Sequence, residues 1–377
     1  MKPLEVEWLE EAALDDTLRR EWSALIEQCQ EASLFQTPEW TLNWWQHLGE
    51  GTLRVLTVRR DGRLVGLASL MERVESFHGL RLRTLRFVGD PEADHCGLLS
   101  DDHDEGALSA TVDAVCEAAR EVDVVRLSEI GAGSAVDAAF KVRATRTLRQ
   151  VCGCAPVLEL EGTLEELEGS YSKTLRTRLR RARNRQKKLG ALLFERWQPK
   201  AEEVPQLFEK LRTIEALKVD ERAARGEPIN GLLTTPARWS FMLDASAEFA
   251  GRGWLDVATL EKEGRLIAYR LGFRFRGAFL DYNLAHDSEF AALSPGRVLL
   301  DEIVRDSHQL GMQSVDASRG SLVNPHLLSD WPSSPRWHVR WILLGSSIKG
   351  RTLGLIERGL KPALRKLRGQ PAPPEPN

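Results

Sequence analysis

The sequence lacks the cysteine and histidine patterns that mark disulfide-rich and metal-binding proteins. Its five cysteines are an odd number without a Cys-x-x-Cys pair, and Cys152 and Cys154 are too close for an ordinary disulfide. The eight histidines are scattered, with no His-Glu-x-x-His spacing of a zinc enzyme. We therefore expect reduced thiols, as in a cytosolic protein, and we predict no metal site.

Long apolar runs and a leader-like start are also missing. No run approaches the roughly 18 residues needed to cross a bilayer, so we expect no transmembrane segment. The stretch MKPLEVEWLEEAALDD at the start is acidic and lacks the basic-then-apolar order of a signal peptide. The net charge of -3 gives no global attraction to nucleic acid. These absences favour a cytoplasmic location and disfavour nucleic acid as a partner.

Several catalytic motifs are absent as well. We find no Gly-x-Ser-x-Gly elbow, no phosphate-binding Gly-x-x-x-x-Gly-Lys and no Gly-x-Gly-x-x-Gly, which leaves hydrolase, P-loop and dinucleotide functions without support. What is present is an ordinary globular composition, 42% hydrophobic and 28% charged. A length of 377 residues predicts two or three domains.

Helix and hairpin signals in the first half predict an α/β unit. The segment 14–30 has the 3.6-residue apolar spacing of an amphipathic helix, and Thr37-Pro38 opens a second, tryptophan-rich helix. Two strand-like runs flank Asp61-Gly62, a strong hairpin signal. A strand over 82–89, a helix over 106–121 and a strand over 122–130 complete the unit.

The second half repeats this order about 200 residues later, which indicates a tandem duplication. Thr235-Pro236 opens a helix as Thr37-Pro38 does, and strands flank Glu263-Gly264 as they flank Asp61-Gly62. A strand over 277–285, a loop, a helix over 297–310 and a strand over 312–318 follow. Both halves therefore predict mixed sheets covered by helices.

The loop Ser294-Pro295-Gly296-Arg297 is the first candidate site. It leads from a strand into a helix N-terminus, where unpaired N–H groups and the helix dipole attract phosphate. Gly296 allows close approach to the backbone, and Arg297 adds a charged donor. The alternative is an ordinary helix cap, with Ser294 as N-cap and Pro295 in the first turn.

A second polar cluster ends the strand before that loop. Ligands of α/β folds lie beyond the carboxyl ends of strands, so Tyr282 to Asp287 are candidates. His286 can act as a base near neutral pH, and Asp287 can orient a partner. The alternative is a loop in which Asp287 caps local N–H groups. Asp281 and Tyr282 are weaker candidates, because neighbouring strand residues face opposite sides.

The segment 171–188 carries nine basic residues and no acidic one. As a helix docked by Leu175 and Leu179, it can bind a polyanion or an anionic surface. Aromatic residues for base stacking are missing except Tyr171, which weakens an RNA-binding hypothesis. The alternative is a solvated helix whose arginines pair with acidic neighbours such as residues 165–168.

Together these landmarks resemble a known family. The segment Leu34 to Trp40, the basic helix, and Gly264 to Ala268 followed by Ser294-Pro295-Gly296 are similar to GNAT acyltransferases of the CelD-like, cellulose-biosynthesis type. That group is similar in turn to the FemABX transferases, which carry tandem GNAT domains. The resemblance covers roughly residues 20–345 and implies two mixed sheets, each split at a bulge, with the donor pyrophosphate at a helix N-terminus.

The resemblance carries specific roles over to this chain. It implies acyl-CoA, with acetyl-CoA favoured, as a co-substrate bound by Ser294, Pro295, Gly296 and Arg297 in the second copy. The corresponding loop of the first copy, residues 97–106, is acidic and would repel phosphate, so we expect that copy to be a scaffold. The family's Tyr-Lys pair is replaced here by residues 321–326, which puts the substrate and the activity in question.

The sequence thus predicts an acyltransferase with an N-terminal GNAT-like domain (1–160), a C-terminal donor-binding GNAT domain (161–345) and a basic segment with a proline-rich tail (346–377). His286, Asp287 and Asp316 are the candidate bases. The acceptor is an amine or hydroxyl on a small molecule or glycan, including an exopolysaccharide precursor. The alternatives are an aminoacyl-tRNA-dependent transferase and a non-catalytic scaffold. The acyl group, the acceptor and the oligomeric state do not follow from the sequence.

Overall fold

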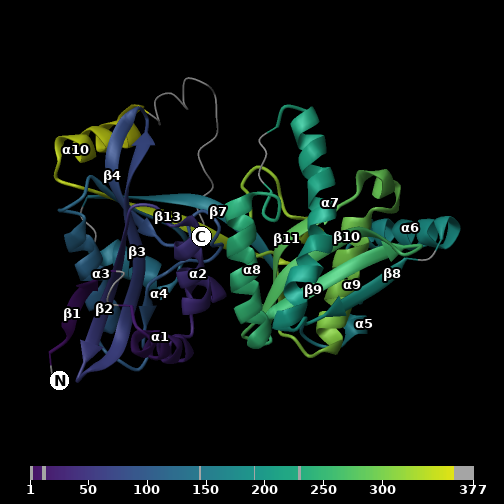
Figure 1. Cartoon of the computed structure of the whole chain (residues 1–377), viewed down its shortest axis with the longest axis horizontal. Coiled ribbons are helices and arrows are strands. Elements are labelled where there is room, and N and C mark those ends of the chain that lie inside the picture. The colour runs from purple at the N-terminus through teal and green to yellow at the C-terminus, as the bar shows by residue number, and fades with distance from the viewer. Residues whose placement is uncertain (1–2, 11–13, 144–145, 191, 228–230, 361–377) are drawn as a thin grey trace. The chain divides into compact units, whose positions relative to one another are not determined.

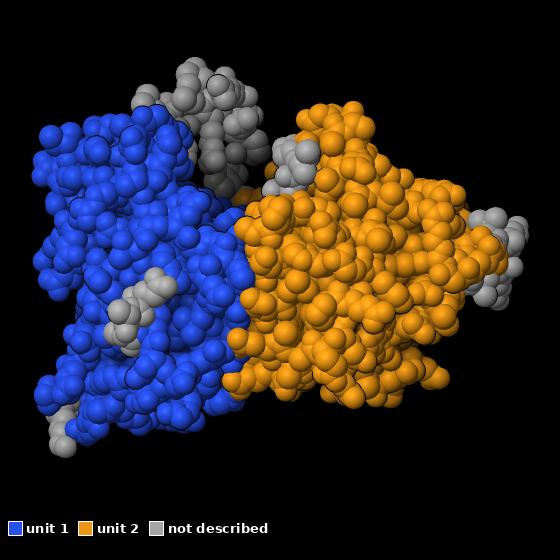
Figure 2. All heavy atoms as spheres, viewed as in Figure 1, with its two compact units in different colours: residues 1–153, 337–377 blue, residues 154–336 orange. Residues whose placement is uncertain are grey.

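The computed structural model describes residues 3–10, 14–143, 146–190, 192–227 and 231–360 (Figure 1). The chain divides into two compact units (Figure 2). Unit 1 contains residues 1–153 and 337–377, and unit 2 contains residues 154–336. Within the described residues, no helix has the length and apolar character that a bilayer span requires.

Unit 1 is built on a mixed sheet with the strand order β1-β2-β3-β4-β6-β13, and β5 pairs with β3. β4 and β6 run parallel, while the other pairs along this order are antiparallel. The strands are β1 (Glu5–Leu9), β2 (Thr52–Arg60), β3 (Arg63–Phe77), β4 (Leu80–Phe87), β5 (Leu99–Ser100), β6 (Val124–Gly131) and β13 (Ser334–Leu344). The helices are α1 (Asp16–Gln28), η2 (Leu34–Gln36), α2 (Pro38–Leu48), α3 (Ala107–Ala118), α4 (Ala135–Arg143), α10 (Ile348–Leu355) and η6 (Ile356–Leu360).

Unit 2 repeats this plan with the strand order β7-β12-β11-β10-β9-β8. Here β11 and β12 form the parallel pair. The strands are β7 (Thr147–Glu159), β8 (Leu193–Trp197), β9 (Leu255–Lys262), β10 (Arg265–Phe275), β11 (Ala278–His286) and β12 (Ser314–Asp316). The helices are α5 (Leu164–Gly169), α6 (Lys173–Leu189), η3 (Ala201–Glu203), α7 (Val204–Ala224), α8 (Pro236–Gly251), η4 (Ser288–Leu293), α9 (Pro295–Gln309) and η5 (Leu327–Asp330).

The predicted duplication is confirmed by the order of elements and by local backbone geometry. The two hairpin turns have nearly the same positive φ values, 54° and 77° at Asp61-Gly62 and 53° and 78° at Glu263-Gly264. A second pair of turns, His78-Gly79 and Arg276-Gly277, also matches, with φ values of 50° and 77° and of 49° and 77°. Glycine after a residue that tolerates a left-handed conformation favours such tight hairpins.

Helix starts follow the sequence signals. Thr37 accepts a hydrogen bond from the Trp40 N–H and Pro38 fills the first turn, as the Thr-Pro pattern predicts. Trp40 and Trp44 are buried in the core of unit 1 and do not form an exposed stacking surface. The basic segment after residue 345 is helical through Leu360, while the proline-rich end lies outside the described residues.

The division into units falls inside two strands. The boundary between Gly153 and Cys154 lies within β7, and the boundary between Arg336 and Trp337 lies within β13. β13 pairs with β6 in unit 1, while the last residues of β7 pair with β12 in unit 2. The sequence-based boundaries after residues 160 and 345 remain a prediction about separable domains.

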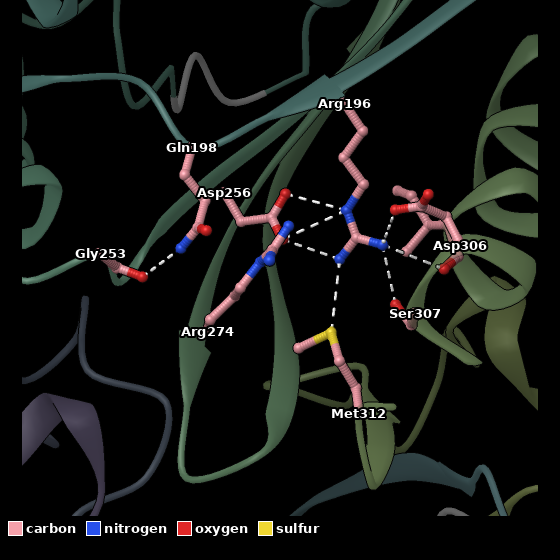
Figure 3. A network of polar contacts seen from close by, with 9 residues as sticks. Arg196, Gln198, Gly253, Asp256, Arg274, Asp306, Ser307 and Met312 are labelled. Carbon is pink, nitrogen blue, oxygen red and sulfur yellow. Dashed lines mark hydrogen bonds and ion pairs between the residues drawn. The ribbon is translucent and has the colours of Figure 1, made fainter. Parts of the chain in front are cut away.

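A buried guanidinium, that of Arg196, connects β8 and β9 of unit 2 to the helix α9 (Figure 3). Arg196 on β8 binds both carboxylate oxygens of Asp256 on β9, with Nε–Oδ1 and Nη2–Oδ2 distances of 2.9 and 2.8 Å. Its Nη1 donates to the Asp306 carboxylate and the Ser307 hydroxyl of α9, each at 2.9 Å. Because the hydrogen bonds compensate for burial, this network fixes α9 against the sheet.

We predict that Gly272 on β10 is required for stability. A Cβ at this position would lie 2.4 Å from the Phe279 ring and 2.5 Å from the Leu280 carbonyl oxygen. Gly272→Ala should therefore lower the free energy of unfolding by about 1–3 kcal/mol through overpacking, measured by denaturant unfolding. Gly251→Ala, at the end of α8 with no atom within 4 Å of the added Cβ, is the control and should be neutral or stabilising. Equal effects of the two variants would contradict the close packing.

Candidate functional site

The candidate site begins where the two parallel strands of unit 2 separate. β11 and β12 pair only from Ala278–Ser314 to Leu280–Asp316. β11 then continues for six residues to His286, whereas the chain after β12 turns at Ser318, a buried residue with a φ of 59°. The described pairing of the two strands thus ends at Leu280, which leaves one edge of β11 available beyond that point.

A bulge lies next to this divergence. The register between β10 and β11 shifts from Leu271–Asn283 to Gly272–Asp281, so Tyr282 is the extra residue. An extra residue in a strand is left out of the hydrogen-bond ladder and re-aims its backbone and side chain. The Asn283 side chain accepts from the Tyr269 hydroxyl at 2.9 Å. The bulge therefore presents the backbone of Tyr282 beside the strand opening.

A buried ion pair connects the divergence to α9. Arg270 on β10 pairs with Asp281 on β11, and its Nη2 donates to the Gly296 carbonyl oxygen at 3.2 Å. Both side chains are 1% exposed. Burial alone would raise the pKa of Asp281, but the charges and hydrogen bonds of Arg270 and His326 outweigh it and lower the pKa. The pair thus fixes the first turn of α9 relative to the bulge.

His326 lies in the segment 321–326, in which the sequence departs from the family that it resembles. Its Nδ1 accepts from the Leu328 N–H at 3.1 Å, which leaves Nε2 as the donor toward Asp281, 3.4 Å away. Both ring nitrogens are thereby used. His326 holds Asp281 in place in this arrangement.

The predicted phosphate loop has an open surface at Gly296. Ser294 has a left-handed backbone with a φ of 53°, and its carbonyl oxygen accepts from the N–H groups of Arg297 and Val298. Pro295 has no N–H and is buried. A Cβ built on Gly296 meets no atom within 4 Å among the described residues, so the backbone there is accessible to a ligand. This geometry suits close approach of an anion to the first turn of α9.

The structure places Arg297 in an ion-pair cluster. Its Nη1 lies 2.6 Å from Asp330 Oδ2, and the same carboxylate accepts from Arg178 of α6 at 2.9 Å. Trp331 lies under the guanidinium, 5.9 Å from its carbon. Asp330 thus orients two arginines beside the first turn of α9, and the sequence alone does not indicate this pairing.

The three predicted bases lie at opposite ends of β11. Asp316 pairs with Leu280 at the divergence, whereas His286 and Asp287 lie six and seven residues farther on, about 20 Å by the rise of a strand. Asp316 accepts from the Ser318 N–H and pairs with Arg336. Asp287 accepts from the Glu289 N–H and pairs with Arg265, in agreement with its capping alternative. The structure therefore does not bring the three residues to one reacting atom.

Two basic residues, His286 and Lys218, lie near the end of β11. Partial burial of the imidazole, followed by the charge of Lys218, lowers the pKa of His286, although part of the residue remains exposed. Lys218 on α7 donates to the Leu284 carbonyl oxygen at 2.9 Å, and burial lowers its pKa. Sequence reasoning missed Lys218, because a single lysine in a helix carries no motif.

The basic helix α6 is docked by its apolar side, as predicted. Leu175 and Leu179 are buried in the unit 2 core. The alternative of a solvated helix that pairs with acidic neighbours agrees with the described ion pairs, but the acidic partners are not the residues 165–168 named as an example. Arg178 pairs with Asp330 and Arg183 with Asp301, while Glu168 pairs with Arg305 of α9. The helix packs along α9 and η4, so its arginines reach acids there and not on α5.

Unit 1 differs at the corresponding positions. The described pairing of β3 with β4 runs from Leu70–Phe87 to Phe77–Leu80 without a shift, so this pair has no counterpart of the Tyr282 bulge. The register shift in the sheet of unit 1 lies between β2 and β3, at Val58 and Arg59. Cys96 forms a parallel bridge with Ile130 of β6, the counterpart of β12, so a residue of the loop after β4 pairs beside the parallel strands of unit 1. The acidic loop lines a hollow of about 190 Å³, where Asp101 pairs with Arg63 and Asp104 with Arg60. This arrangement has no counterpart of the anion-accepting loop.

Comparison with known proteins identifies the fold of this site. A family model described as an acetyltransferase (GNAT) domain matches residues 173–324, which contain α6, the bulge, the Gly296 loop and the β11–β12 divergence. The search of curated proteins finds no match. Within the described part of the chain, no group of three or more His, Cys, Asp or Glu side chains is placed to hold a metal ion.

Solved structures extend the likeness over most of the chain. FemX has 13% sequence identity, covers 93% of this chain and 100% of its own, and has a TM-score of 0.57. A C-terminal domain of a putative lysylphosphatidylglycerol synthetase from Agrobacterium fabrum has 13% identity, coverages of 90% and 96%, and a TM-score of 0.56. L-PGS from Bacillus licheniformis has 12% identity, coverages of 93% and 96%, and a TM-score of 0.53. These identities show the fold alone, and the predicted GNAT fold is confirmed.

We predict that the Arg270–Asp281 pair stabilises unit 2 strongly. Asp281→Asn leaves a buried, uncompensated guanidinium and should cost about 3–5 kcal/mol at neutral pH, measured by denaturant unfolding. Because the folded-state pKa of Asp281 is lowered, its contribution is present above the ordinary carboxyl pKa and is lost as the pH falls through the folded value. The difference between wild type and variant should therefore shrink in strong acid. Asp330→Asn, at a partly exposed pair, is the control and should cost about 1 kcal/mol or less.

Proposed function

We propose that this protein is an acyltransferase that moves an acyl group, most simply acetyl, from acyl-CoA to an amine or hydroxyl, with the donor bound by unit 2 in the cytoplasm. The observation that carries the proposal is the grouping of three features around β11. They are the β11–β12 divergence, the Tyr282 bulge and the open Gly296 backbone, which Arg270 joins to the strand pair. Together they combine polar backbone groups with an anion-accepting turn.

In this proposal the pyrophosphate of the donor lies at Ser294 to Arg297 and its thioester lies near Tyr282. A backbone N–H at the bulge polarises the thioester carbonyl, and the acceptor nitrogen or oxygen attacks the carbonyl carbon. The bond to sulfur breaks as the new amide or ester bond forms, and the free thiol leaves with the electron pair. The proton of the acceptor passes to a base, directly or through water.

In this proposal the predicted polar residues divide between the two ends of the donor. Asp316 lies at the level of the divergence, so we assign the base to Asp316, whose partner Arg336 is 42% exposed. His286 and Asp287 lie at the phosphate end, and we expect them to influence donor binding. Lys218 binds the carbonyl oxygen of Leu284, two residues past the bulge, and is a further group that could take up a proton near β11.

We define the acceptor only by its chemical class. An amine or hydroxyl on a small molecule or a sugar, including an exopolysaccharide or envelope precursor, fits the proposal, and the CelD-like resemblance supports the sugar. Unit 1, in which Cys96 pairs beside the parallel strands and the loop is acidic, fits a scaffold that binds no donor.

A second candidate function uses aminoacyl-tRNA as the donor. It is favoured by the exposed arginines of α6 and by the fold shared with FemX. Its signature would be RNA binding that weakens steeply with salt. A non-catalytic scaffold is the third candidate, supported by the position of His326, which occupies the segment of the family's Tyr-Lys pair and binds Asp281.

We predict that Gly296→Val weakens donor binding without destabilising the fold. The added side chain enters open space, so the melting temperature without ligand should change little. Titration with acetyl-CoA and longer acyl-CoAs should raise the melting temperature of the wild type, because a ligand that binds only the folded state stabilises it. The shift should be lost or strongly reduced in Gly296→Val and in Arg297→Glu, and retained in Gly251→Ala.

Two results would count against this proposal. An equal shift in Gly296→Val and in the wild type would place the thioester elsewhere. No shift with any thioester would favour the tRNA-dependent or scaffold function, and a salt-dependent RNA-binding assay would then distinguish those two.

We predict that substitutions at the two ends of β11 have different kinetic effects. Asp316→Asn should lower kcat by about 10²- to 10⁴-fold, the usual contribution of a positioned base. His286→Gln should mainly raise KM for the donor, with kcat nearly unchanged. Steady-state kinetics with acetyl-CoA and an amine acceptor provides the test, with circular dichroism as the check on folding. Unchanged turnover after substitution of His286, Asp287 and Asp316 together would exclude all three as the base.

A further inference from the structure

The exposed side of α6 lies beside the proposed donor turn. Arg178 contacts Asp330, the residue that also binds Arg297 in the first turn of α9. Seven residues later, Arg185 Nη1 donates at 2.5 Å to the carbonyl oxygen of Ala292, two residues before Ser294. Two contacts of one helix flank therefore bracket the start of α9.

Arg181 lies between these two contacts on the same flank. At 3.6 residues per turn, positions 178, 181 and 185 fall within about 60° of the helix circumference. Arg178 and Arg185 are committed to η5 and η4, whereas Arg181 is exposed. The helix spacing thus directs an exposed guanidinium toward the bracketed turn. Arg180, also exposed, lies on the opposite side, about 160° away from Arg178.

The local charge balance is positive. Arg178, Arg181, Arg185 and Arg297 contribute four positive charges near the first turn of α9, and Asp330 contributes one negative charge. The nearby acids Asp287 and Glu289 both pair with Arg265. The site therefore carries more positive charge than a single pyrophosphate group at Gly296 needs, because the Gly296 backbone and the Arg297 guanidinium already serve that group.

We propose that Arg181, supported by Arg185, binds the 3′-phosphate of coenzyme A, so that α6 makes the site selective for the intact nucleotide. The proposal rests on the proposed donor site at Gly296. The pyrophosphate and the 3′-phosphate are joined through one ribose, so a donor anchored at Gly296 carries its third phosphate within reach of a long side chain. Arginine suits this role, because its planar guanidinium forms paired hydrogen bonds with phosphate oxygens.

RNA is the competing partner for a basic helix. An extended polyanion would contact exposed cations all around α6, including Arg180, and its affinity would depend on the total positive charge of the helix. Arg178 and Arg185 lie on one flank of α6 and contact Asp330 and the Ala292 carbonyl oxygen, which lie on either side of the first turn of α9. This localised arrangement favours a compact ligand with clustered phosphates.

The test compares acetyl-CoA with acetyl-dephospho-CoA, which lacks only the 3′-phosphate, by isothermal titration calorimetry on the full chain. Wild type should bind acetyl-CoA about tenfold more tightly, the value of one charge-assisted hydrogen bond at a partly exposed site. Arg181→Ala should lose this preference and leave acetyl-dephospho-CoA binding unchanged. Arg180→Ala is the matched control and should bind both ligands as the wild type does. The double variant Arg181→Ala/Arg185→Ala should bind each of the two ligands almost as well as Arg181→Ala binds acetyl-dephospho-CoA. Its affinity should be lower by no more than about threefold.

The alternative outcomes are distinguishable. Equal affinity of the wild type for the two thioesters would overturn this inference and leave the donor site intact. Equal losses in Arg180→Ala and Arg181→Ala would also overturn it, and equal weakening of RNA binding in both would assign α6 to a polyanion. Failure of the wild type to bind either thioester would refute the proposed function itself.

Discussion

Two buried arginines set the position of α9, and the candidate site depends on that position. Arg270 binds the Gly296 carbonyl oxygen in the first turn, and Arg196 binds groups in the second half of the helix. Each arginine is balanced by a buried aspartate on a neighbouring strand, Asp281 and Asp256 respectively. Because an unpaired buried charge is costly, each helix contact is tied to the strand register that supplies the aspartate. The first turn of α9 is thereby held relative to the bulge and the strand divergence.

The two copies of the fold illustrate how one plan supports different chemistry. Both copies use the same tight hairpins and the same parallel pair of strands, joined through a helix. In unit 2 a bulge and a diverging edge leave backbone groups accessible, whereas in unit 1 Cys96 bridges to Ile130 and acidic side chains pair with arginines. The difference lies in the residues that follow β4 in unit 1 and β11 in unit 2. In unit 1 these residues include Cys96, which pairs with β6, whereas in unit 2 the chain after β11 continues into η4 and α9.

Much of the fold follows from local signals in the sequence. The Thr-Pro helix starts, the Asp61-Gly62 and Glu263-Gly264 turns and the docking leucines of α6 are determined by residues close together in the chain, and the structure agrees with each. The helix start at Ser294-Pro295-Gly296 was predictable for the same reason, while its role in binding a donor stays a prediction. What could not be predicted depends on long-range register. The pairing of Arg178 with Asp330 joins residues 152 positions apart, and the Arg270–Asp281 pair requires knowledge of the bulge.

The distribution of unit 1 over both ends of the chain has a consequence for biosynthesis. The ribosome produces all of unit 2 before it reaches Trp337, the first residue of the segment through which β13 completes the sheet of unit 1. Domains usually fold as they emerge, from the N-terminus onward. Here the continuous unit 2 can finish first, while the earlier-made strand β6 waits for a partner translated some 200 residues later. Until then the edge of β6 is open to mispairing with other nascent chains, a vulnerability that a chaperone holding the nascent chain would offset.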